Sequence, residues 1–519
     1  MWEKLKDIKY YSCETISYKP PIRCDKISGF FGWGSDAKQA RPEGGRSGLA
    51  SGFGSKSGGR SRANRELRSV ATPTGGTPKK KKSYEIPYIY FVIRKFRTPE
   101  DKVVRSWAFF DWANSAFALV ITVAIFPVYF ASMSPDTLYL LGMEFTDSSV
   151  YTYSISLAYL LIAFSSPLFS GIADYAGRRR SFLHFFTVLG GVACMGLAAF
   201  SSPDAWWVGI ICFMLGIIGF AGGLVFYNSF LPIITSKDRY DRVSAMGFAY
   251  GYVGSVILLI INLIVIQYPA WFGLADGAAA SRLSFIMVGL WWIGFGYFSI
   301  RGLPADKQTP IRLRTIASGY REILYVTREV AKQGFIVRFL LAFFFYSAGV
   351  QTVLFVASTF GEKELGLSAS ELILLILLLQ ILATAGAYLF AYISKRLGNQ
   401  VGLMIMVILW MGICISGYFL VEKFSFYILA CFVGLVMGGI QSQSRSTYSK
   451  LMKEGEKNVS SYFSFYDLVE KVAIVMGTFT FALLDQYSGS MRSGLLLLSV
   501  YFLLGFVLLA LLRPPKNRL

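Results

Sequence analysis

Twelve apolar stretches, most of them near twenty residues long, constrain the fold of this 519-residue chain more than any other feature. A helix needs about 20 residues to cross the hydrocarbon core of a bilayer. Only 16% of the residues are charged, against about 25% in an average soluble domain. The sequence therefore predicts an all-α, multi-pass membrane protein. The stretches lie at 107–131, 150–172, 182–201, 206–232, 244–267, 283–300, 335–360, 371–394, 400–421, 425–447, 462–484 and 493–512.

A polar segment at 301–334 divides these stretches into two sets of six. We expect a six-helix bundle over 99–300, a cytoplasmic central loop over 301–334, a second six-helix bundle over 335–512 and a short tail at 513–519. Two amphipathic turns of the central loop are suited to lie along the membrane surface.

The basic residues are distributed unequally between the two sides of the predicted membrane part. Loops on the side of Arg178 hold 21 Lys and Arg, whereas the opposite loops hold Lys363, Lys423 and Arg492, with Arg282 at a border. By the positive-inside rule, both termini and the central loop are cytoplasmic. The net charge of +20 is thus spread over a tail and many loops, which argues against a nucleic-acid partner.

The first 98 residues have no helical or strand period, and we expect a disordered basic tail. Its run Lys79–Lys82 is interpreted either as a solvated charge run or as a site of attraction for anionic lipid headgroups. No Met lies between the first residue and Met133. A second interpretation is therefore that the native chain starts near Val92 or Val103.

Three charged residues interrupt the stretch at 462–484: Asp467, Glu470 and Lys471. One such charge at mid-membrane costs about 2.5–3.5 kcal/mol on insertion scales, and charges inside spans usually face a bundle interior or a wet cavity. Asp467 and Lys471 are four residues apart, so they share a helix face and partly neutralise each other. Glu470 lies one position off that face, without a local partner. We expect this helix to border a water-filled path.

Polar residues in three other stretches are candidates for the same path. Asp111 and Asn114 share a face of the first stretch; the alternative is that Asp111 lies near the headgroups and helps to begin the helix. Tyr227 and Asn228 end the fourth stretch, where Pro232 helps to terminate the helix.

The tenth stretch ends with Gln441 and Arg445, four residues apart on one face. The alternative for Arg445 is that its side chain extends to the cytoplasmic surface. Tyr466, next to Asp467, completes the predicted pathway.

The segment SGIADYAGRRRS, residues 170–181, is a tight acidic-Gly-basic turn between the second and third stretches. Gly177 permits the backbone to reverse, and Asp174 can accept hydrogen bonds from a neighbouring helix start. Arg178, Arg179 and Arg180 hold the loop on the cytoplasmic side. The turn resembles the loop signature of the major facilitator superfamily, although Ser170 stands where that family usually has Gly.

Four segments in order narrow the resemblance: FFDWANSAF, VFYNSFLPIITSKDRYDRVSAMGFAYGYVG, GGIQSQSRSTYSKL and FSFYDLVEKVAIVMG. They resemble the vacuole-effluxer branch of that superfamily, named for an autophagy-related fungal protein. The resemblance implies twelve helices in two bundles and alternating access around a central site. Fungal members of the branch are regarded as amino-acid effluxers. Glu470 departs from the branch, which tends to have Gly there.

These observations predict a secondary transporter for a small solute, amino acids being the class that the resemblance implies, with a coupling proton or ion as a further partner. Because the charged residues lie toward the cytoplasmic side, we expect ion pairs that form and break as a gate. The neighbouring Lys471 disfavours Asp467 as a proton relay. We expect a monomer in the inner membrane of a prokaryote or the vacuolar membrane of a fungus.

Two other classes of function were weighed. An intramembrane enzyme is disfavoured because His184 is the only His, which excludes an HExxH zinc site, and no GxSxG elbow is present. No cofactor, metal site or ATP-binding loop is predicted. A non-transporting receptor or a lipid-handling protein on the same scaffold stays open, because a fold does not fix a function.

Overall fold

The computed structural model describes five ranges of the chain: 99–135, 137–140, 142–307, 313–488 and 490–512. The chain divides into two units, Met1–Ser83 and Tyr84–Leu519, and the described residues all belong to the second. The predicted disordered tail, with Lys79–Lys82 and the alternative start near Val92, lies outside them, as do Arg312 and the tail at 513–519.

Eleven helices within the described ranges are long and apolar enough to cross a membrane. The first is continuous over α2 (Pro99–Ala116), the π-helix η1 (Phe117–Ile125) and α3 (Phe126–Met133). The others in this half are α4 (Asp147–Ala176), α5 (Arg179–Gly196), α6 (Trp206–Ile234), α7 (Tyr240–Gln267) and α8 (Gly277–Arg301). Those of the second half are α10 (Gly334–Leu365), α11 (Ala369–Leu397), α12 (Asn399–Tyr418), α13 (Lys423–Leu451) and α15 (Met491–Ala510).

A further long helix, α14 (Val459–Ser488), has 30 residues and is the one that carries Asp467, Glu470 and Lys471. Because it carries these charges, α14 is not among the eleven helices that are apolar enough to cross a membrane. That α14 is the twelfth membrane span therefore stays a prediction. Single 3₁₀ turns lie at η2 (Leu197–Ala199), η3 (Pro203–Ala205), η4 (Lys237–Arg239) and η5 (Pro269–Phe272).

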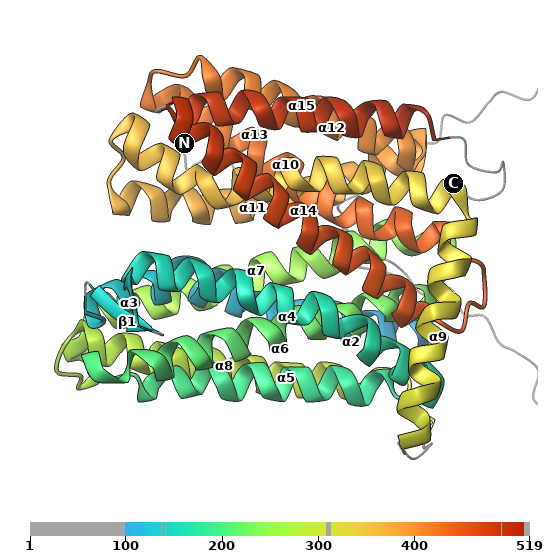
Figure 1. Ribbon diagram of the computed structural model, residues 1–519, viewed down its shortest axis with the longest axis horizontal. Helices are drawn as coiled ribbons and strands as arrows, with labels where there is room; N and C mark the ends of the chain where they lie inside the picture. Colours follow the sequence, from blue (N-terminus) through green and yellow to red (C-terminus); the bar gives the residue numbers. More distant parts are fainter. Residues whose placement is uncertain (1–98, 136, 141, 308–312, 489, 513–519) are drawn as a thin grey trace, which may run out of the picture. The chain divides into compact units, whose positions relative to one another are not determined.

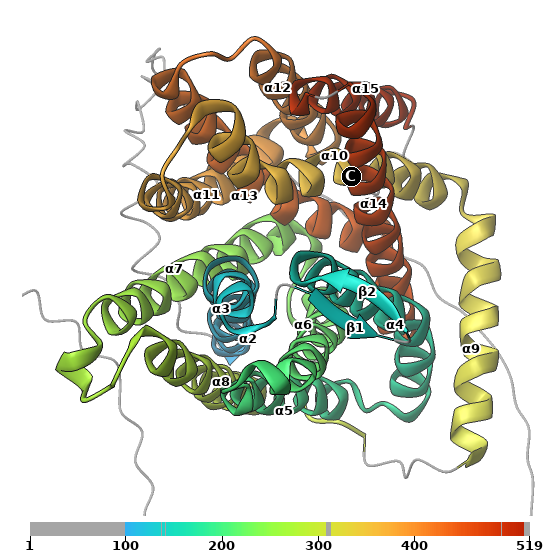
Figure 2. The same cartoon turned by 60° about the vertical axis from the view of Figure 1, so that its left-hand side comes forward.

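The helices pack as two bundles, α2–α8 and α10–α15, which lie side by side in Figures 1 and 2. Apart from Tyr252 of α7, the apolar core of the second bundle comes from residues beyond 325. The core of the first bundle comes from residues before 304. This confirms the predicted two-bundle membrane fold, in which each helix buries an apolar stripe against its own neighbours.

The two bundles are connected by α9 (Leu313–Lys332), which runs across the ends of the other helices in Figure 1. The prediction of two amphipathic turns was wrong in detail, because they form one 20-residue helix. α9 approaches α4 closely: a Cβ on Gly171 would lie 2.5 Å from the Gly319 carbonyl oxygen. Gly171, next to Ser170, thus allows the close contact between α4 and α9.

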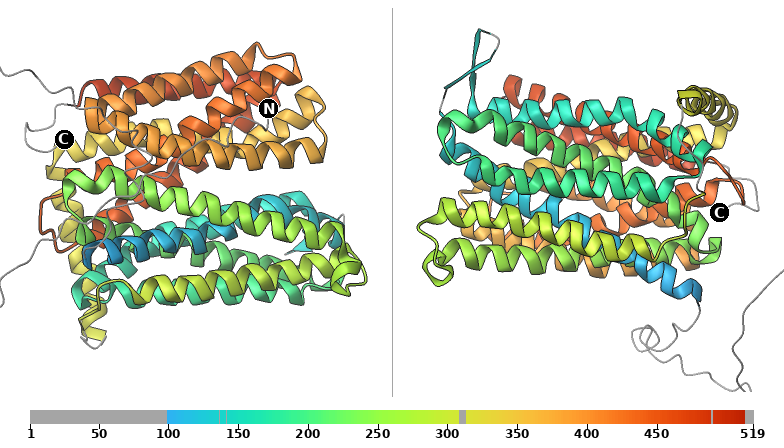
Figure 3. Two further views of the ribbon diagram at one scale, coloured as in Figure 1. Left: turned by 180° about the vertical axis from the view of Figure 1, so that it is seen from behind. Right: turned by 90° about the horizontal axis from the view of Figure 1, so that it is seen from below.

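The two ends of the bundles differ. One end carries α9 and the Arg178–Arg180 turn, and we call it the basic end. The opposite end carries a short antiparallel hairpin of β1 (Thr137–Leu140) and β2 (Met143–Thr146), visible in Figure 3. The strict all-α prediction missed this hairpin, whose four-residue strands lie in a connection between two apolar stretches.

Candidate transport pathway

Asp111 lies well inside the first helix rather than at its start. The helix begins at Pro99, with Glu100 in its first turn, where Pro and an acid are favoured. Asp111 is buried, and it accepts hydrogen bonds from the Tyr227 hydroxyl at 3.1 Å and the Ser115 hydroxyl at 3.4 Å. Asp111 is therefore an interior residue of the helix, and the alternative that it helps to begin the helix was wrong.

Arg445 of α13 reaches into the first bundle. Its Nε donates to the Ser244 hydroxyl at 2.9 Å, its Nη2 to the Ser244 carbonyl at 2.8 Å and its Nη1 to Asn228 Oδ1 at 3.1 Å. Its Nη1 is also 3.7 Å from Asp111 Oδ2. Arg445 is only 2% exposed, so the alternative that it extends to the surface was wrong.

Three aromatic rings enclose the Arg445 guanidinium. Its central carbon lies 4.8 Å from the ring centre of Trp107, 5.3 Å from that of Tyr227 and 4.2 Å from that of Phe248. A planar cation gains attraction from such ring faces, most strongly where water is excluded. The rings come from α2, α6 and α7, so one side chain of the second bundle contacts three helices of the first.

Tyr227 and Asn228 are interior residues of α6, which continues to Ile234 with Pro232 inside its last turn. The prediction that the helix ends at these residues was wrong. Pro232 has no N–H to donate to the carbonyl four residues earlier, and the helix ends two residues after it. Asn228 thus lies inside the helix, where its Oδ1 accepts from Arg445 of the second bundle.

A second polar cluster, which the sequence analysis missed, joins the bundles closer to the basic end. Lys450 Nζ is 2.7 Å from Asp241 Oδ2 of α7 and donates to Asn399 Oδ1 of α12 at 2.7 Å. Asn399 also donates to Asp241 Oδ1 at 2.6 Å. Lys450 is one of the 21 basic residues counted in the loops, and Asp241 was not predicted to take part in a contact. One feature of the sequence could have indicated this pair: Asp241 and Lys450 have opposite charges and follow the fourth stretch of each half, the fourth and the tenth of the chain.

The turn that contains Asp174 forms a third contact between the bundles. Asp174 accepts from the backbone N–H of Ser460 at 3.3 Å and of Ser461 at 2.7 Å, at the start of α14. This confirms the predicted capping of a neighbouring helix, where a carboxylate also suits the helix dipole. Gly177 has φ +66°, which confirms the predicted backbone reversal.

The three arginines of this turn have different partners. Arg179 Nε lies 2.8 Å from Asp174 Oδ1 and also donates to the Ser460 hydroxyl at 2.9 Å. The backbone N–H of Arg180 donates to Asp306, in the segment that leads to α9, at 2.9 Å. Arg178 is the residue that precedes α5. The turn therefore ties the first bundle both to α14 and to the segment before α9.

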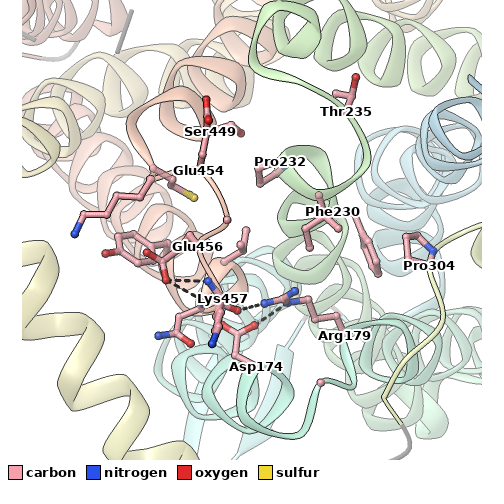
Figure 4. Close-up of a pocket in the computed structure, with 18 of the residues that line it drawn as sticks. Asp174, Arg179, Phe230, Pro232, Thr235, Pro304, Ser449, Glu454, Glu456 and Lys457 are labelled. Atoms are coloured by element: carbon pink, nitrogen blue, oxygen red, sulfur yellow. Dashed lines mark hydrogen bonds and ion pairs between the residues drawn. The ribbon is translucent and has the colours of Figure 1, made fainter. Parts of the chain in front are cut away.

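A cavity of about 1220 Å³ lies beside these contacts at the basic end. Its wall comes from the start of α5, from α4, α6, α7, α9, α13 and α14, and from the segments between them. Figure 4 shows Asp174, Arg179 and Lys457 close together on one side of it, with dashed lines marking their contacts. The cavity thus adjoins the polar contacts that hold the two bundles together.

The three charged residues of α14 form one cluster farther along the helix. Lys471 Nζ lies 3.1 Å from Asp467 Oδ1 and 3.2 Å from Glu470 Oε2, which confirms the predicted pairing of Asp467 with Lys471. Glu470 Oε1 accepts from the Gln351 amide of α10 at 3.2 Å. The prediction that Glu470 lacks a local partner was therefore wrong, because Lys471 reaches sideways to it. The Lys471 ammonium lies 5.3 Å from the ring centre of Tyr159 of α4, in the first bundle.

The remaining predicted residues are placed as follows. Gln441 Oε1 accepts from the Tyr252 hydroxyl of α7 at 2.7 Å, another contact across the bundles. Tyr466 is stacked on Phe343 of α10 with ring centres 4.2 Å apart, inside the second bundle. Asn114 is fully buried, and neither of its side-chain amide atoms has a hydrogen-bond partner among the described residues.

A family model described as "Vacuole effluxer Atg22 like" matches residues 100–518. The chain belongs to this Atg22-like family. The uncharacterized MFS-type transporter YxiO of Bacillus subtilis (strain 168) is 31% identical to it over 359 residues, covering 69% of this chain and 82% of that protein. Autophagy-related protein 22-2 of Aspergillus niger is 23% identical over 406 residues, covering 61% of this chain and 68% of that protein.

Solved structures share the fold of this Atg22-like chain. The proton:xylose symporter XylE of the major facilitator superfamily has a TM-score of 0.60 at 13% identity, covering 80% of this chain and 96% of its own. The fucose transporter FucP, in an outward conformation, has a TM-score of 0.59 at 12% identity, covering 80% and 100%. The protein is thus a multi-pass membrane transporter of the major facilitator type.

Proposed function

We propose that this chain is a secondary active transporter that moves a small solute of the amino-acid class by alternating access. One observation carries the proposal: polar side chains of both bundles meet in buried contacts toward the basic end. Arg445 with Ser244, Lys450 with Asp241 and the Asp174 cap of α14 each join one bundle to the other. Contacts of this kind are available in one arrangement of the bundles and are lost when that end opens.

In this proposal the two moving bodies are residues 99–300 and 335–512, linked by 301–334. The Arg178 side faces the cytoplasm, as the distribution of basic residues favours. The arrangement described here is then the state in which the cytoplasmic end is closed. Opening requires the Arg445 and Lys450 contacts to separate, and their charged groups become hydrated by water that enters from the cavity at that end.

The amino-acid class is supported by the cluster on α14. An amino acid carries an ammonium and a carboxylate, so its site needs groups of both signs within reach. Glu470 and Lys471 supply both, where α14 contacts α4 and α10. We expect this transporter in a vacuolar or an inner membrane, which the similarity to a vacuole-effluxer family and to a bacterial transporter supports. A coupling proton or ion belongs to the same proposal.

Uptake by reconstituted vesicles tests this function. Vesicles that contain the protein should accumulate a subset of a labelled amino-acid mixture, measured by mass spectrometry against empty vesicles. Asp467→Asn should abolish that accumulation, because it removes one of the two carboxylates that face Lys471 and so changes the charges that the solute meets at this site. Glu364→Gln, which removes a carboxylate that pairs with Arg492 within the second bundle, is the matched control and should transport normally.

Two results would contradict the proposal. Vesicles that move no solute, from protein shown to be folded, would favour the receptor or lipid-handling alternative. Unchanged transport by Asp467→Asn would remove this carboxylate from the gate and from the pathway.

A further inference from the structure

The cluster on α14 differs in charge balance from the ion pairs that close the basic end. Arg445 faces Asp111, and Lys450 faces Asp241, so each of these cations meets one carboxylate. On α14, by contrast, the single ammonium of Lys471 lies within 3.2 Å of two carboxylates. With all three side chains ionised, the cluster carries one negative charge in excess.

An excess charge is costly at this depth in the membrane. Gln351, which contacts Glu470, lies near the middle of α10, and Tyr159, which faces Lys471, lies near the middle of α4. A buried charge without a counter-charge costs several kcal/mol in a medium of low dielectric constant. The neutral Gln351 amide and Tyr159 ring do not supply the missing positive charge. One additional positive charge, supplied by a bound cation, would therefore neutralise the cluster.

Two features show where that cation would enter. The Glu470 side chain is 22% exposed, whereas those of Lys471 and Asp467 are 6% and 4% exposed. Glu470 is thus the member of the cluster that solvent reaches. Asp467 Oδ2, although buried, has no hydrogen-bond partner among the described residues, so a second carboxylate oxygen is also free to accept.

We propose that Glu470 makes the solute site selective for a molecule with one net positive charge, whose ammonium or guanidinium binds the carboxylates of this cluster. The inference rests on the proposed transport function and narrows its substrate class. The solute's carboxylate binds beside Lys471, and its additional cationic group completes the charge balance. A neutral solute of the same shape leaves the excess charge uncompensated and binds more weakly.

Binding to the purified full-length protein in lipid nanodiscs tests the inference with matched solutes. L-lysine is compared with L-norleucine, which lacks the ε-ammonium, and L-arginine with L-citrulline, which lacks the guanidinium charge. Isothermal titration should show that each cation binds about tenfold or more tightly than its neutral partner, as expected for a charge-assisted contact in a desolvated site.

Glu470→Gln should remove that preference and bring the affinities for the two members of each pair together. Glu364→Gln is the matched control, since it removes one carboxylate from the opposite end and should keep the preference. If Glu470→Gln does not fold, the ratio of lysine to norleucine affinity in the wild-type protein still tests whether the site prefers a cation.

Equal binding of cations and neutral solutes by the wild-type protein would overturn the inference. The inference would also be overturned if norleucine bound with uptake of one proton, because that proton would then balance the excess negative charge of the cluster. Proton uptake is detected by titration in two buffers of different ionisation enthalpy. Cation binding without any flux in vesicles would leave this inference standing and refute the transport function instead.

Discussion

Replacing Arg445 with Gln should open the basic end. The variant loses three hydrogen bonds from the guanidinium to Ser244 and Asn228 and leaves the Asp111 carboxylate buried without its cation. Breaking a buried pair by removing one partner costs about 3–5 kcal/mol. These contacts exist only while the bundles meet, so the cost falls on the closed state. Even 3 kcal/mol lowers its population relative to the open state about 150-fold, since about 1.4 kcal/mol is a factor of ten.

The opening can be measured by thiol labelling at position 442. Ser442 is fully buried at the contact between α13 and α7, where its carbonyl accepts from Ser244 at 2.7 Å. In a background whose six cysteines are replaced by serine, Ser442→Cys should react slowly with a membrane-impermeant maleimide. Adding Arg445→Gln should raise the labelling rate by one to two orders of magnitude when reagent reaches the basic end.

Two further variants separate the gate from general loss of stability. Arg492→Gln removes an arginine that pairs with Glu364 within the second bundle, at 3.0 Å, and should leave labelling unchanged. Combining Asp111→Asn with Arg445→Gln should slow labelling again, because no uncompensated charge is then buried. Unchanged labelling in the Arg445→Gln variant would refute the reasoning.

Three other changes test particular contacts by thermal unfolding. Gly254→Ala should lower the melting temperature and cost about 1–3 kcal/mol of unfolding free energy, because its Cβ would lie 2.7 Å from a carbonyl oxygen of α2. Gly294→Ala is the control: its Cβ would meet no atom within 4 Å, and the melting temperature should stay unchanged. Asp174→Ala should cost about 0.5–2 kcal/mol, because the α14 cap is lost, and should speed hydrogen exchange there. Burial, aided by the Asp174 carboxylate, raises the pKa of Glu322, so ionised Glu322 destabilises the folded protein near pH 7. Glu322→Gln should therefore raise the melting temperature at pH 7, and this gain should shrink as the pH falls toward 5 and the wild-type carboxyl becomes protonated.

The sequence predicted the parts of the structure that depend on local pattern. Apolar stretches of sufficient length gave the helices, because each must satisfy its backbone hydrogen bonds internally and face lipid or a neighbour. The turn at Asp174 was also predictable, since Gly177 has to reverse the chain and the acid has to find a donor. The pairing of Asp467 with Lys471 followed from their spacing alone.

The sequence did not predict contacts whose partners are distant in the chain. The rings around Arg445 come from three helices of the other bundle, and the amide that contacts Glu470 is 119 residues away. Nothing local identifies Asp241 and Lys450 as partners. Helix ends were also misplaced, because α2 begins at Pro99, eight residues before its apolar stretch, so Asp111 is an interior residue of the helix rather than one near its start.

Alternating access requires the two bundles to open in turn at their two ends. Electron–electron double resonance in nanodiscs tests it with two pairs of spin labels, one at positions 237 and 454 at the basic end and one at 275 and 422 at the opposite end. Lys237 and Glu454 are 3.4 Å apart across the bundles, so the first pair reports directly on closure. Addition of solute, or the Arg445→Gln substitution, should lengthen the first distance and shorten the second. Distances that stay fixed, or that change in the same sense, would contradict it.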